Sequence, residues 1–236
     1  MVTRQAGRSI IEAAIRKGKV ALPANSFHFR IAVMAVLVAV LSATAGVAFW
    51  KMTQMRSPQS QEALLVLPEP RVIDDFRLKD TSGLAFTLNE LRGSWTLMFF
   101  GFTHCPDVCP TALYELQQVQ DQLERELPDG APIPRVVFVS VDPERDTSDK
   151  LAQYLSHFDP DFVGVSGSDE QLLPFTRQVG IAYRIEDHDA GTLNYSVDHS
   201  SGILLMNPAG KLYGVFPAPH RAELMANDLV NVLENS

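Results

Sequence analysis

The sequence is poor in cysteine: its 236 residues include only Cys105 and Cys109. Two cysteines form at most one pair, which excludes a fold held together by several disulfide bonds. Both cysteines lie within one five-residue stretch, so their chemistry is expected to be local.

Basic residues are scarce in most of the chain. Residues 51–236 carry 14 lysines and arginines against 27 acidic residues. Binding to nucleic acid requires clustered positive charge, so the composition argues against nucleic acid as a partner. Residues 1–50 have the opposite balance, with six basic residues and one acidic residue, and the charge therefore changes sign along the chain.

Long uncharged runs are also rare, and the one from Ile31 to Trp50 is twenty residues long. At about 1.5 Å rise per residue, such a helix matches a hydrocarbon core of roughly 30 Å. The run therefore predicts a transmembrane helix, bracketed by Arg30 and Lys51. The alternative is a signal peptide cleaved near Ala43-Thr44-Ala45. The thirty residues before the run favour an uncleaved anchor, because signal peptides have a shorter basic segment.

The charge difference predicts the orientation of this span. Basic residues stay on the cytoplasmic side, so residues 1–30 are expected in the cytoplasm and everything after Lys51 on the other side. This orientation indicates a single-pass protein of the bacterial inner membrane with a periplasmic domain, or the equivalent mitochondrial arrangement. Residues 51–70, with three prolines between Ser57 and Pro70, predict an extended linker.

Residues 71–236 alternate between short apolar runs and amphipathic stretches. We expect a hairpin at 76–88, strands at 95–102, 135–141, 162–165, 203–206 and 212–216, and helices at 110–127, 147–158, 168–179 and 221–233. Strands that alternate with helices, followed by a hairpin and a last helix, predict a mixed α/β sheet flanked by helices. This is the element order of a thioredoxin-like fold.

The segment GFTHCPDVCPTAL, residues 101–113, places Cys105 after a buried strand and Cys109 at the start of a helix. Sites of open α/β sheets lie at the carboxyl ends of strands, and a helix N-terminus favours thiolate over thiol. Two thiolates at this spacing can hold one soft metal ion or close a disulfide. A purely structural disulfide and two inert buried cysteines remain alternatives.

A metal held by two thiolates needs a further ligand, and histidines are the candidates. His28 precedes the predicted span and lies on the wrong side, while His157 and His220 are expected at the surface. The remaining three are His104, His188 and His199. Position alone favours His199. It comes just before a predicted apolar strand, and Cys105 comes just after another one.

Three blocks of sequence together resemble one family: GFTHCPDVCPTAL at 101–113, VSVDPERDT at 139–147 and YSVDHSSGILLMNPAG at 195–210. The chain resembles, from about Val72 to Leu233, the Sco/SenC family of membrane-anchored, thioredoxin-fold copper proteins that serve cytochrome c oxidase assembly. The resemblance implies that Cys105, Cys109 and His199 bind copper. It leaves the role of Asp142 open between a residue near the copper and a turn or helix-capping carboxylate.

The chemistry of these ligands agrees with that assignment. Soft thiolates select Cu(I), imidazole suits both Cu(I) and Cu(II), and three ligands leave copper accessible for transfer, whereas structural zinc sites usually have four. The sequence predicts a copper metallochaperone whose partners are the copper-site subunit of cytochrome c oxidase and other copper-handling proteins.

The alternative is a thiol-disulfide oxidoreductase that uses a redox disulfide between Cys105 and Cys109 on a copper-accepting partner. Reductases of this fold carry a proline before the strand that faces the cysteines, and this chain has Ser200-Ser201-Gly202 there. A peroxidase fits less well, because the peroxiredoxin active-site pattern is missing.

Overall fold

The structure, a computed structural model, describes residues 26–54, 63–189 and 191–235, and the chain divides into two compact units, residues 1–58 and 59–236. In the first unit, α2 (Ser26–Gln54) is one helix of 29 residues. Over the described part of the chain, no helix meets the length and apolarity needed to cross a membrane. The span predicted at Ile31 to Trp50 is therefore not confirmed.

Several predictions about the N-terminal part lie outside the described residues. These are the basic segment at 1–25 and the linker at 55–62, together with the side chains of Arg30, Trp50 and Lys51.

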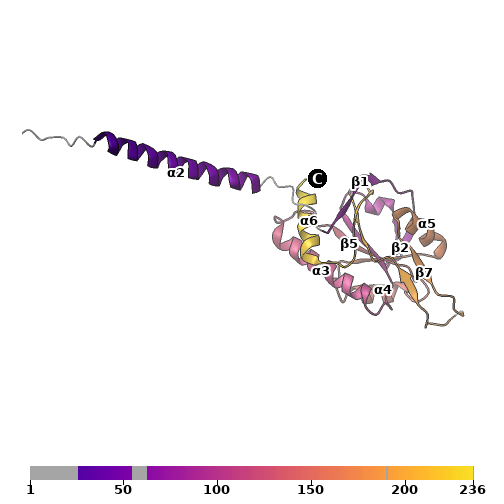
Figure 1. Cartoon of the computed structure of the whole chain (residues 1–236). Helices are drawn as coiled ribbons and strands as arrows, with labels where there is room; N and C mark the ends of the chain where they lie inside the picture. Colours follow the sequence, from indigo (N-terminus) through magenta and orange to yellow (C-terminus); the bar gives the residue numbers. More distant parts are fainter. Residues whose placement is uncertain (1–25, 55–62, 190, 236) are drawn as a thin grey trace, which may run out of the picture. The chain divides into compact units, whose positions relative to one another are not determined.

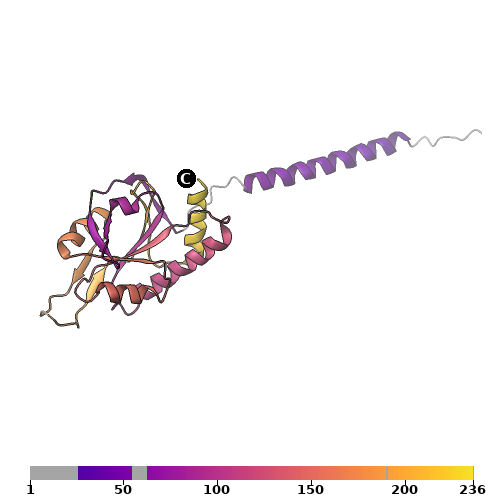
Figure 2. The ribbon, with the colours of Figure 1, turned by 180° about the vertical axis from the view of Figure 1, so that it is seen from behind.

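The second unit is built on an eight-stranded mixed sheet with the strand order β1-β10-β9-β4-β5-β6-β2-β3. Its strands are β1 (Leu65–Arg71), β2 (Arg77–Asp80), β3 (Ala85–Thr87), β4 (Thr96–Gly101), β5 (Arg135–Ser140), β6 (Val163–Ser166), β9 (Ile203–Met206) and β10 (Leu212–Phe216). The helices are η1 (Leu88–Leu91), α3 (Val108–Glu126), α4 (Ser148–Leu155), α5 (Asp169–Val179) and α6 (Ala222–Glu234). Figures 1 and 2 show helices on both faces of the sheet, as the sequence predicts.

The central strand β4 delivers the chain to the site. All six of its residues are buried, because it pairs in parallel with β5 on one side and antiparallel with β9 on the other. A strand that is buried on both faces has apolar residues at successive positions, which explains the continuous apolar run in the sequence. The carboxyl ends of β4 and β5 therefore lie at the same edge of the sheet.

Helix α3 follows β4 and packs its apolar stripe inward, with Leu113, Leu116 and Val119 completely buried. It contacts α6 on the same side, while α4 contacts β6 and α5 contacts β2. The spacing of the apolar residues on α3 is that of one helix face, so the predicted helix and its buried face are confirmed.

The structure differs from the sequence expectation at β1. This strand pairs with β10, so the sheet begins inside the predicted linker 51–70. Pro68 and Pro70 are compatible with a strand here because β1 is an edge strand, where a missing N–H donor leaves no bond unmade. The start of the strand is held by Asp228, whose carboxylate accepts hydrogen bonds from the Ala63 and Leu64 N–H groups at 2.8 Å each.

A second, two-stranded sheet was not predicted. It pairs β7 (Tyr183–Ile185) with β8 (Val197–His199) antiparallel, with Tyr183 opposite His199. Each strand has only three residues and no clear alternation, so the sequence pattern gives no signal for it. This small sheet carries His199.

Candidate metal centre

The site begins in the loop that follows β4. The Thr103 N–H and hydroxyl both donate to the Asp146 carboxylate, at 2.9 and 2.5 Å. The Ser140 hydroxyl at the end of β5 donates to the same carboxylate at 2.6 Å. Asp146 is buried, and its hydrogen bonds fix the backbone two residues before Cys105.

Cys105 precedes α3, and Cys109 lies in its first turn. The Cys109 N–H points at the Cys105 sulfur at 3.4 Å, while the N-cap residue Asp107 makes no side-chain cap bond. A free N–H at a helix N-terminus favours a negatively charged acceptor. The Cys105 sulfur thus accepts a backbone N–H in the first turn of α3.

Cys109 has a different environment from Cys105. It is completely buried, whereas Cys105 is partly exposed. Burial raises the pKa of the Cys109 thiol, because a thiolate is poorly solvated there. The sequence predicts that the helix N-terminus favours thiolate over thiol, and at Cys109 burial acts in the opposite direction. The two cysteines are not bonded to each other in the structure, so the predicted disulfide stays a prediction.

His199 reaches the cysteines from β8. Its Nε2 lies 3.4 Å from the Cys109 sulfur, and its Nδ1 lies 3.0 Å from the Ser200 carbonyl oxygen. A carbonyl only accepts, so Nδ1–H is the donor and Nε2 holds the lone pair. Metal-bound histidines typically have this second hydrogen bond, which fixes the tautomer and aims the free nitrogen at the metal.

Two aromatic rings hold the imidazole in place. Phe99 and Phe102 contact it edge to face, with ring centroids 6.1 and 5.8 Å from that of His199. Both phenylalanines are buried, Phe99 within β4 and Phe102 directly after it. Because the rings restrict its rotation, the imidazole keeps Nε2 directed at the cysteines.

The structure brings the three predicted ligand residues together. Among the described residues, the two sulfurs and one ring nitrogen of Cys105, Cys109 and His199 form the group able to hold a metal ion, and these atoms lie within 4.8 Å of one another. Ligands that share one ion with bonds of about 2.3 Å lie at most roughly 4.6 Å apart, so little movement is needed. Two sulfurs and an imidazole are a soft donor set that suits copper.

Asp142 is not part of this group. Its buried carboxylate accepts hydrogen bonds from the Tyr195 hydroxyl at 2.6 Å and from Arg145 Nε. Arg145 also donates to the Tyr195 carbonyl oxygen at 2.9 Å, and its guanidinium lies 3.8 Å from the centre of the Tyr195 ring. The helix-capping alternative is excluded, because Thr147 caps α4. Asp142 therefore holds Tyr195, which lies four residues before His199.

His188 also contacts Tyr195 and belongs to the same group of interacting side chains. Its ring stacks on Tyr195 at 3.7 Å between centroids, Nε2 lies 2.9 Å from Glu144, and Nδ1 lies 2.7 Å from the Glu186 carbonyl oxygen. These hydrogen bonds raise the pKa of His188. The loop between β7 and β8, which leads to His199, is thus attached to the domain through Tyr195 and His188.

The remaining histidines lie outside the ligand group. His104 is exposed, with Nδ1 at 3.1 Å from the Thr103 hydroxyl, and His157 is exposed and bonded to the Gln153 carbonyl oxygen. The expectation that His220 is a solvated surface residue is wrong. Its ring packs edge to face on Phe99, and burial lowers its pKa.

Sequence reasoning missed the residues that position the ligands. These are Gly101, Asp146, Arg145, Tyr195 and Ser200. All five lie within the three sequence blocks that carry the resemblance, with Gly101 in 101–113, Arg145 and Asp146 in 139–147, and Tyr195 and Ser200 in 195–210.

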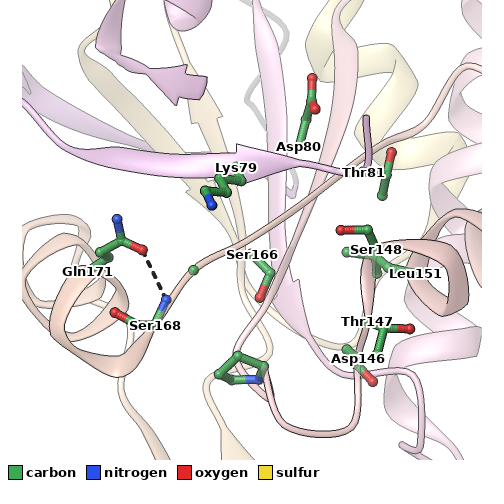
Figure 3. Close-up of a pocket in the computed structure, with 12 residues that line it drawn as sticks. Lys79, Asp80, Thr81, Asp146, Thr147, Ser148, Leu151, Ser166, Ser168 and Gln171 are labelled. Carbon is green, nitrogen blue, oxygen red and sulfur yellow. Dashed lines mark hydrogen bonds between the residues drawn. The ribbon is translucent and has the colours of Figure 1, made fainter. Parts of the chain in front are cut away.

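A pocket of about 360 Å³ lies beside the centre, between the starts of α4 and α5 (Figure 3). Lys79, Thr147, Ser148 and Ser168 contribute to its lining, and the Ser168 N–H donates to Gln171 at 3.0 Å within it. None of the three ligand residues lines this pocket, although Asp146 does. The pocket and the metal centre therefore share one buried carboxylate but are separate features.

Comparisons with known proteins agree with this geometry. Residues 67–234 match the family model described as SCO1/SenC. The human mitochondrial "Protein SCO2 homolog" is 39% identical over 155 residues, which are 66% of this chain and 57% of that protein. The chain thus spans little more than half the length of that relative.

Two solved structures are similar to the described domain. The copper-bound structure of ScoI from Arabidopsis thaliana is 31% identical, with a TM-score of 0.62, over 69% of this chain and 98% of that chain. A member of "the Sco family of cytochrome c oxidase assembly proteins", described with a disulfide switch, shares the fold at 20% identity and a TM-score of 0.55, over 72% of this chain and 95% of that one.

Proposed function

The chain belongs to the SCO1/SenC family, and on that basis we propose that it is a copper metallochaperone that binds copper through Cys105, Cys109 and His199. One observation carries the proposal. The Nε2 lone pair of His199 and the two cysteine sulfurs converge within 4.8 Å, with the imidazole tautomer fixed by the Ser200 carbonyl group.

The ligand set suits both oxidation states in different ways. Cu(I) is satisfied by the two sulfurs, while Cu(II) prefers the mixed sulfur and nitrogen set that His199 completes. Binding replaces the protons of the two thiols, so uptake releases protons to solvent. Three ligands, one of them the partly exposed Cys105, leave the ion open to an incoming ligand from another protein. This accessibility favours delivery over permanent storage.

The recipients we propose are the copper-site subunit of cytochrome c oxidase and other copper-handling proteins. A structural neighbour described as a cytochrome c oxidase assembly protein supports this direction. Transfer to such a protein is a ligand exchange in which its donors replace Cys105, Cys109 and His199 one at a time.

A thiol-disulfide oxidoreductase is the second candidate function. The observation in its favour is that Cys105 and Cys109 are not bonded to each other and lie close together. The Cys109 N–H is directed at the Cys105 sulfur. The neighbour described with a disulfide switch supports the same chemistry. In this reaction the thiolate of one cysteine attacks a partner disulfide, and the second cysteine then displaces the partner.

Metal analysis of the purified full chain tests the main proposal. After reduction and loading with Cu(I), we expect one copper per chain in the parent. Replacement of both cysteines by serine should abolish binding, because serine hydroxyls are poor ligands for Cu(I). A parent that retains no copper, yet reduces a disulfide substrate at a rate dependent on both cysteines, would favour the oxidoreductase.

We further propose that residues 31–50 of α2 anchor the chain in a bacterial inner membrane, with the domain in the periplasm, or in the equivalent mitochondrial orientation. The proposal is supported by the uncharged run within this 29-residue helix and by exposed apolar side chains such as Ile31, Met34 and Leu41. Protease added to spheroplasts that produce the chain should digest the domain. Protection until the inner membrane is broken would contradict the orientation.

A further inference from the structure

His188 lies between two oxygen atoms that both accept hydrogen bonds. Its Nδ1 lies 2.7 Å from the Glu186 carbonyl oxygen, and its Nε2 lies 2.9 Å from a Glu144 carboxylate oxygen. A carbonyl oxygen and a carboxylate only accept, so each ring nitrogen must carry a proton to make both bonds. The two bonds together therefore require the positively charged imidazolium form of His188. A neutral imidazole has one N–H and makes only one of them.

The imidazolium covers one face of the Tyr195 ring. The two rings are stacked, with centroids 3.7 Å apart and an angle of 12° between their planes. The Arg145 guanidinium lies 3.8 Å from the centre of the same ring. Two groups this close to one ring centre would overlap on a single face, so they lie on opposite faces. His188, Tyr195 and Arg145 thus form a stack, called here the Tyr195 stack, in which an aromatic ring lies between two cations. Both contacts are favourable, because a ring face attracts positive charge.

Tyr195 is also fixed through its polar atoms. Its hydroxyl donates to the Asp142 carboxylate at 2.6 Å, and its carbonyl oxygen accepts from Arg145 at 2.9 Å. Asp142 and Arg145 follow β5, so these bonds fasten the chain that enters β8 to the main sheet. Among the side chains of this group, His188 has the ordinary pKa closest to neutral pH. Its proton is therefore the one that a change of pH near neutrality removes.

Contacts continue from the Tyr195 stack to the proposed ligand His199. The Arg145 guanidinium lies 5.4 Å from the centre of the Phe102 ring. Phe102 in turn contacts the His199 imidazole edge to face, with centroids 5.8 Å apart. The backbone provides a second connection, since Tyr195 leads into β8, the strand that ends at His199. A change in the Tyr195 stack is thus transmitted to His199 through side chains and through the backbone.

The charged groups around His188, in space or as its sequence neighbours, come from two segments. They are Asp142, Glu144 and Arg145 after β5, and Glu186, Asp187 and Asp189 after β7. All are acidic except Arg145, which lies beyond the Tyr195 ring. The bonds to the Glu186 carbonyl oxygen and to Glu144 raise the pKa of His188. The imidazolium is therefore fully present below pH 6.5, the ordinary histidine value, and is lost as pH rises through the higher folded value.

We infer that His188 is a positioning residue whose imidazolium holds Tyr195 and thereby keeps His199 in place for Cu(II). The inference rests on the proposed function, since it concerns how copper is held. When the His188 proton leaves to solvent, one hydrogen bond is lost, together with the attraction of the charge to Glu144 and to the Tyr195 ring. His199 is then held less firmly. Cu(II) binding weakens, whereas Cu(I) is satisfied by the two sulfurs and is little affected.

Three substitutions separate the charge of His188 from its shape. His188→Gln keeps N–H donors but is never charged. His188→Arg is always charged, and its planar guanidinium can stack on Tyr195. Glu144→Gln keeps an acceptor but removes the negative charge that helps to retain the His188 proton. His157→Gln is the control for the loss of a histidine, because His157 is exposed and bonds only to the Gln153 carbonyl oxygen.

The experiment measures Cu(II) and Cu(I) affinities of the full-length chains by competition with chelators between about pH 5 and about pH 9. The pKa of His188 is measured by NMR on the metal-free parent. Protons compete for the ligands in every chain alike, so the ratio of parent to variant affinity at each pH isolates the effect of His188. Below the His188 pKa, we expect the parent to bind Cu(II) about two- to fivefold more tightly than His188→Gln, as for one partly exposed charged contact. Above that pKa the two chains should bind Cu(II) equally, and their Cu(I) affinities should agree throughout.

The other variants have distinct expected results. His188→Arg should keep the tighter Cu(II) binding at every pH, because its charge does not titrate in this range. Glu144→Gln should move the change in Cu(II) affinity to lower pH, and His157→Gln should match the parent.

Three outcomes overturn the inference and leave the proposed function intact. The first is a parent-to-His188→Gln ratio for Cu(II) that is the same at every pH, which indicates a structural role without a role for the charge. The second is a ratio that changes at a pH unrelated to the measured pKa of His188. The third is equal weakening of Cu(I), because the effect would then not act through His199. A parent chain that binds no copper at any pH overturns the proposed function, and the inference with it.

Discussion

Gly101 lies at the end of β4 in direct contact with the proposed ligand Cys109, and its replacement by alanine is a sharp test of the packing at the centre. The backbone there is an ordinary strand, so alanine is compatible with its conformation. The difficulty is space, since the new Cβ would lie 2.6 Å from the Cys109 sulfur and 3.0 Å from the Phe138 ring. One of these groups must move.

The magnitude follows from these distances. An ordinary contact begins near 3.4 Å, so the sulfur must retreat by about 0.8 Å, the difference from the 2.6 Å available. Overpacking of this kind costs about 1–3 kcal/mol, of which roughly 0.4–1 kcal/mol is recovered because alanine restricts the unfolded chain. A net loss of about 1 kcal/mol lowers the Tm of a domain of this size by roughly 2–4 °C. The displaced sulfur should weaken Cu(I) binding by about tenfold, or roughly 1.4 kcal/mol.

The assay is a Cu(I) competition titration with thermal unfolding of the metal-free chain in parallel. Gly164→Ala is the control, because its Cβ would meet Leu151 and Thr81 at 2.8 Å, a similarly tight contact that involves none of the proposed ligands. It should lose similar stability but keep the copper affinity of the parent. Parent-like copper binding by Gly101→Ala, or equal weakening by Gly164→Ala, would refute the reasoning.

Two further predictions concern the loop that leads to His199. Tyr195→Phe removes a donor from the buried Asp142 carboxylate and should destabilise the fold by about 1–3 kcal/mol in a urea titration. The same variant should alter the Cu(II) spectrum more than Cu(I) affinity, since only His199 depends on this loop; a greater loss for Cu(I) would contradict that view. The raised pKa of His188 predicts a stability contribution that is complete below pH 6.5, the ordinary histidine pKa, and is lost as pH rises through the higher folded value. His188→Gln should therefore show a flatter dependence of unfolding free energy on pH than the parent, and identical slopes would exclude this contribution.

The sequence predicts the main sheet well because its central strands are enclosed on both faces. Runs such as residues 96–101 and 135–140 then consist almost entirely of apolar residues, which no loop would tolerate. The same reasoning fails for β1, whose prolines and exposed side chains are typical of a linker. Only its pairing with β10, which depends on residues more than a hundred positions away, makes it a strand.

The two cysteines and the histidine of the proposed ligand set are predicted from different kinds of information, the local spacing for the cysteines and the family resemblance for the histidine. Cys105 and Cys109 are evident from their spacing at a strand-to-helix turn. His199 was favoured over His104 and His188 chiefly by resemblance, because its approach depends on the small β7–β8 sheet, which has no sequence signal. The burial of Cys109 is also a tertiary property, and it outweighs the local effect of the helix N-terminus.

The three-ligand centre is tested most directly by copper binding of His199→Ala, with His104→Ala and His188→Ala as controls. The account predicts that His199→Ala binds Cu(I) more weakly but still measurably through the two sulfurs, and that its Cu(II) charge-transfer absorption is lost or strongly altered. His104→Ala should match the parent in both oxidation states, and His188→Ala should still bind both Cu(I) and Cu(II), because neither histidine belongs to the ligand group. Parent-like binding of Cu(I) and Cu(II) by His199→Ala would contradict the account, and the more so if either control lost the Cu(II) absorption instead.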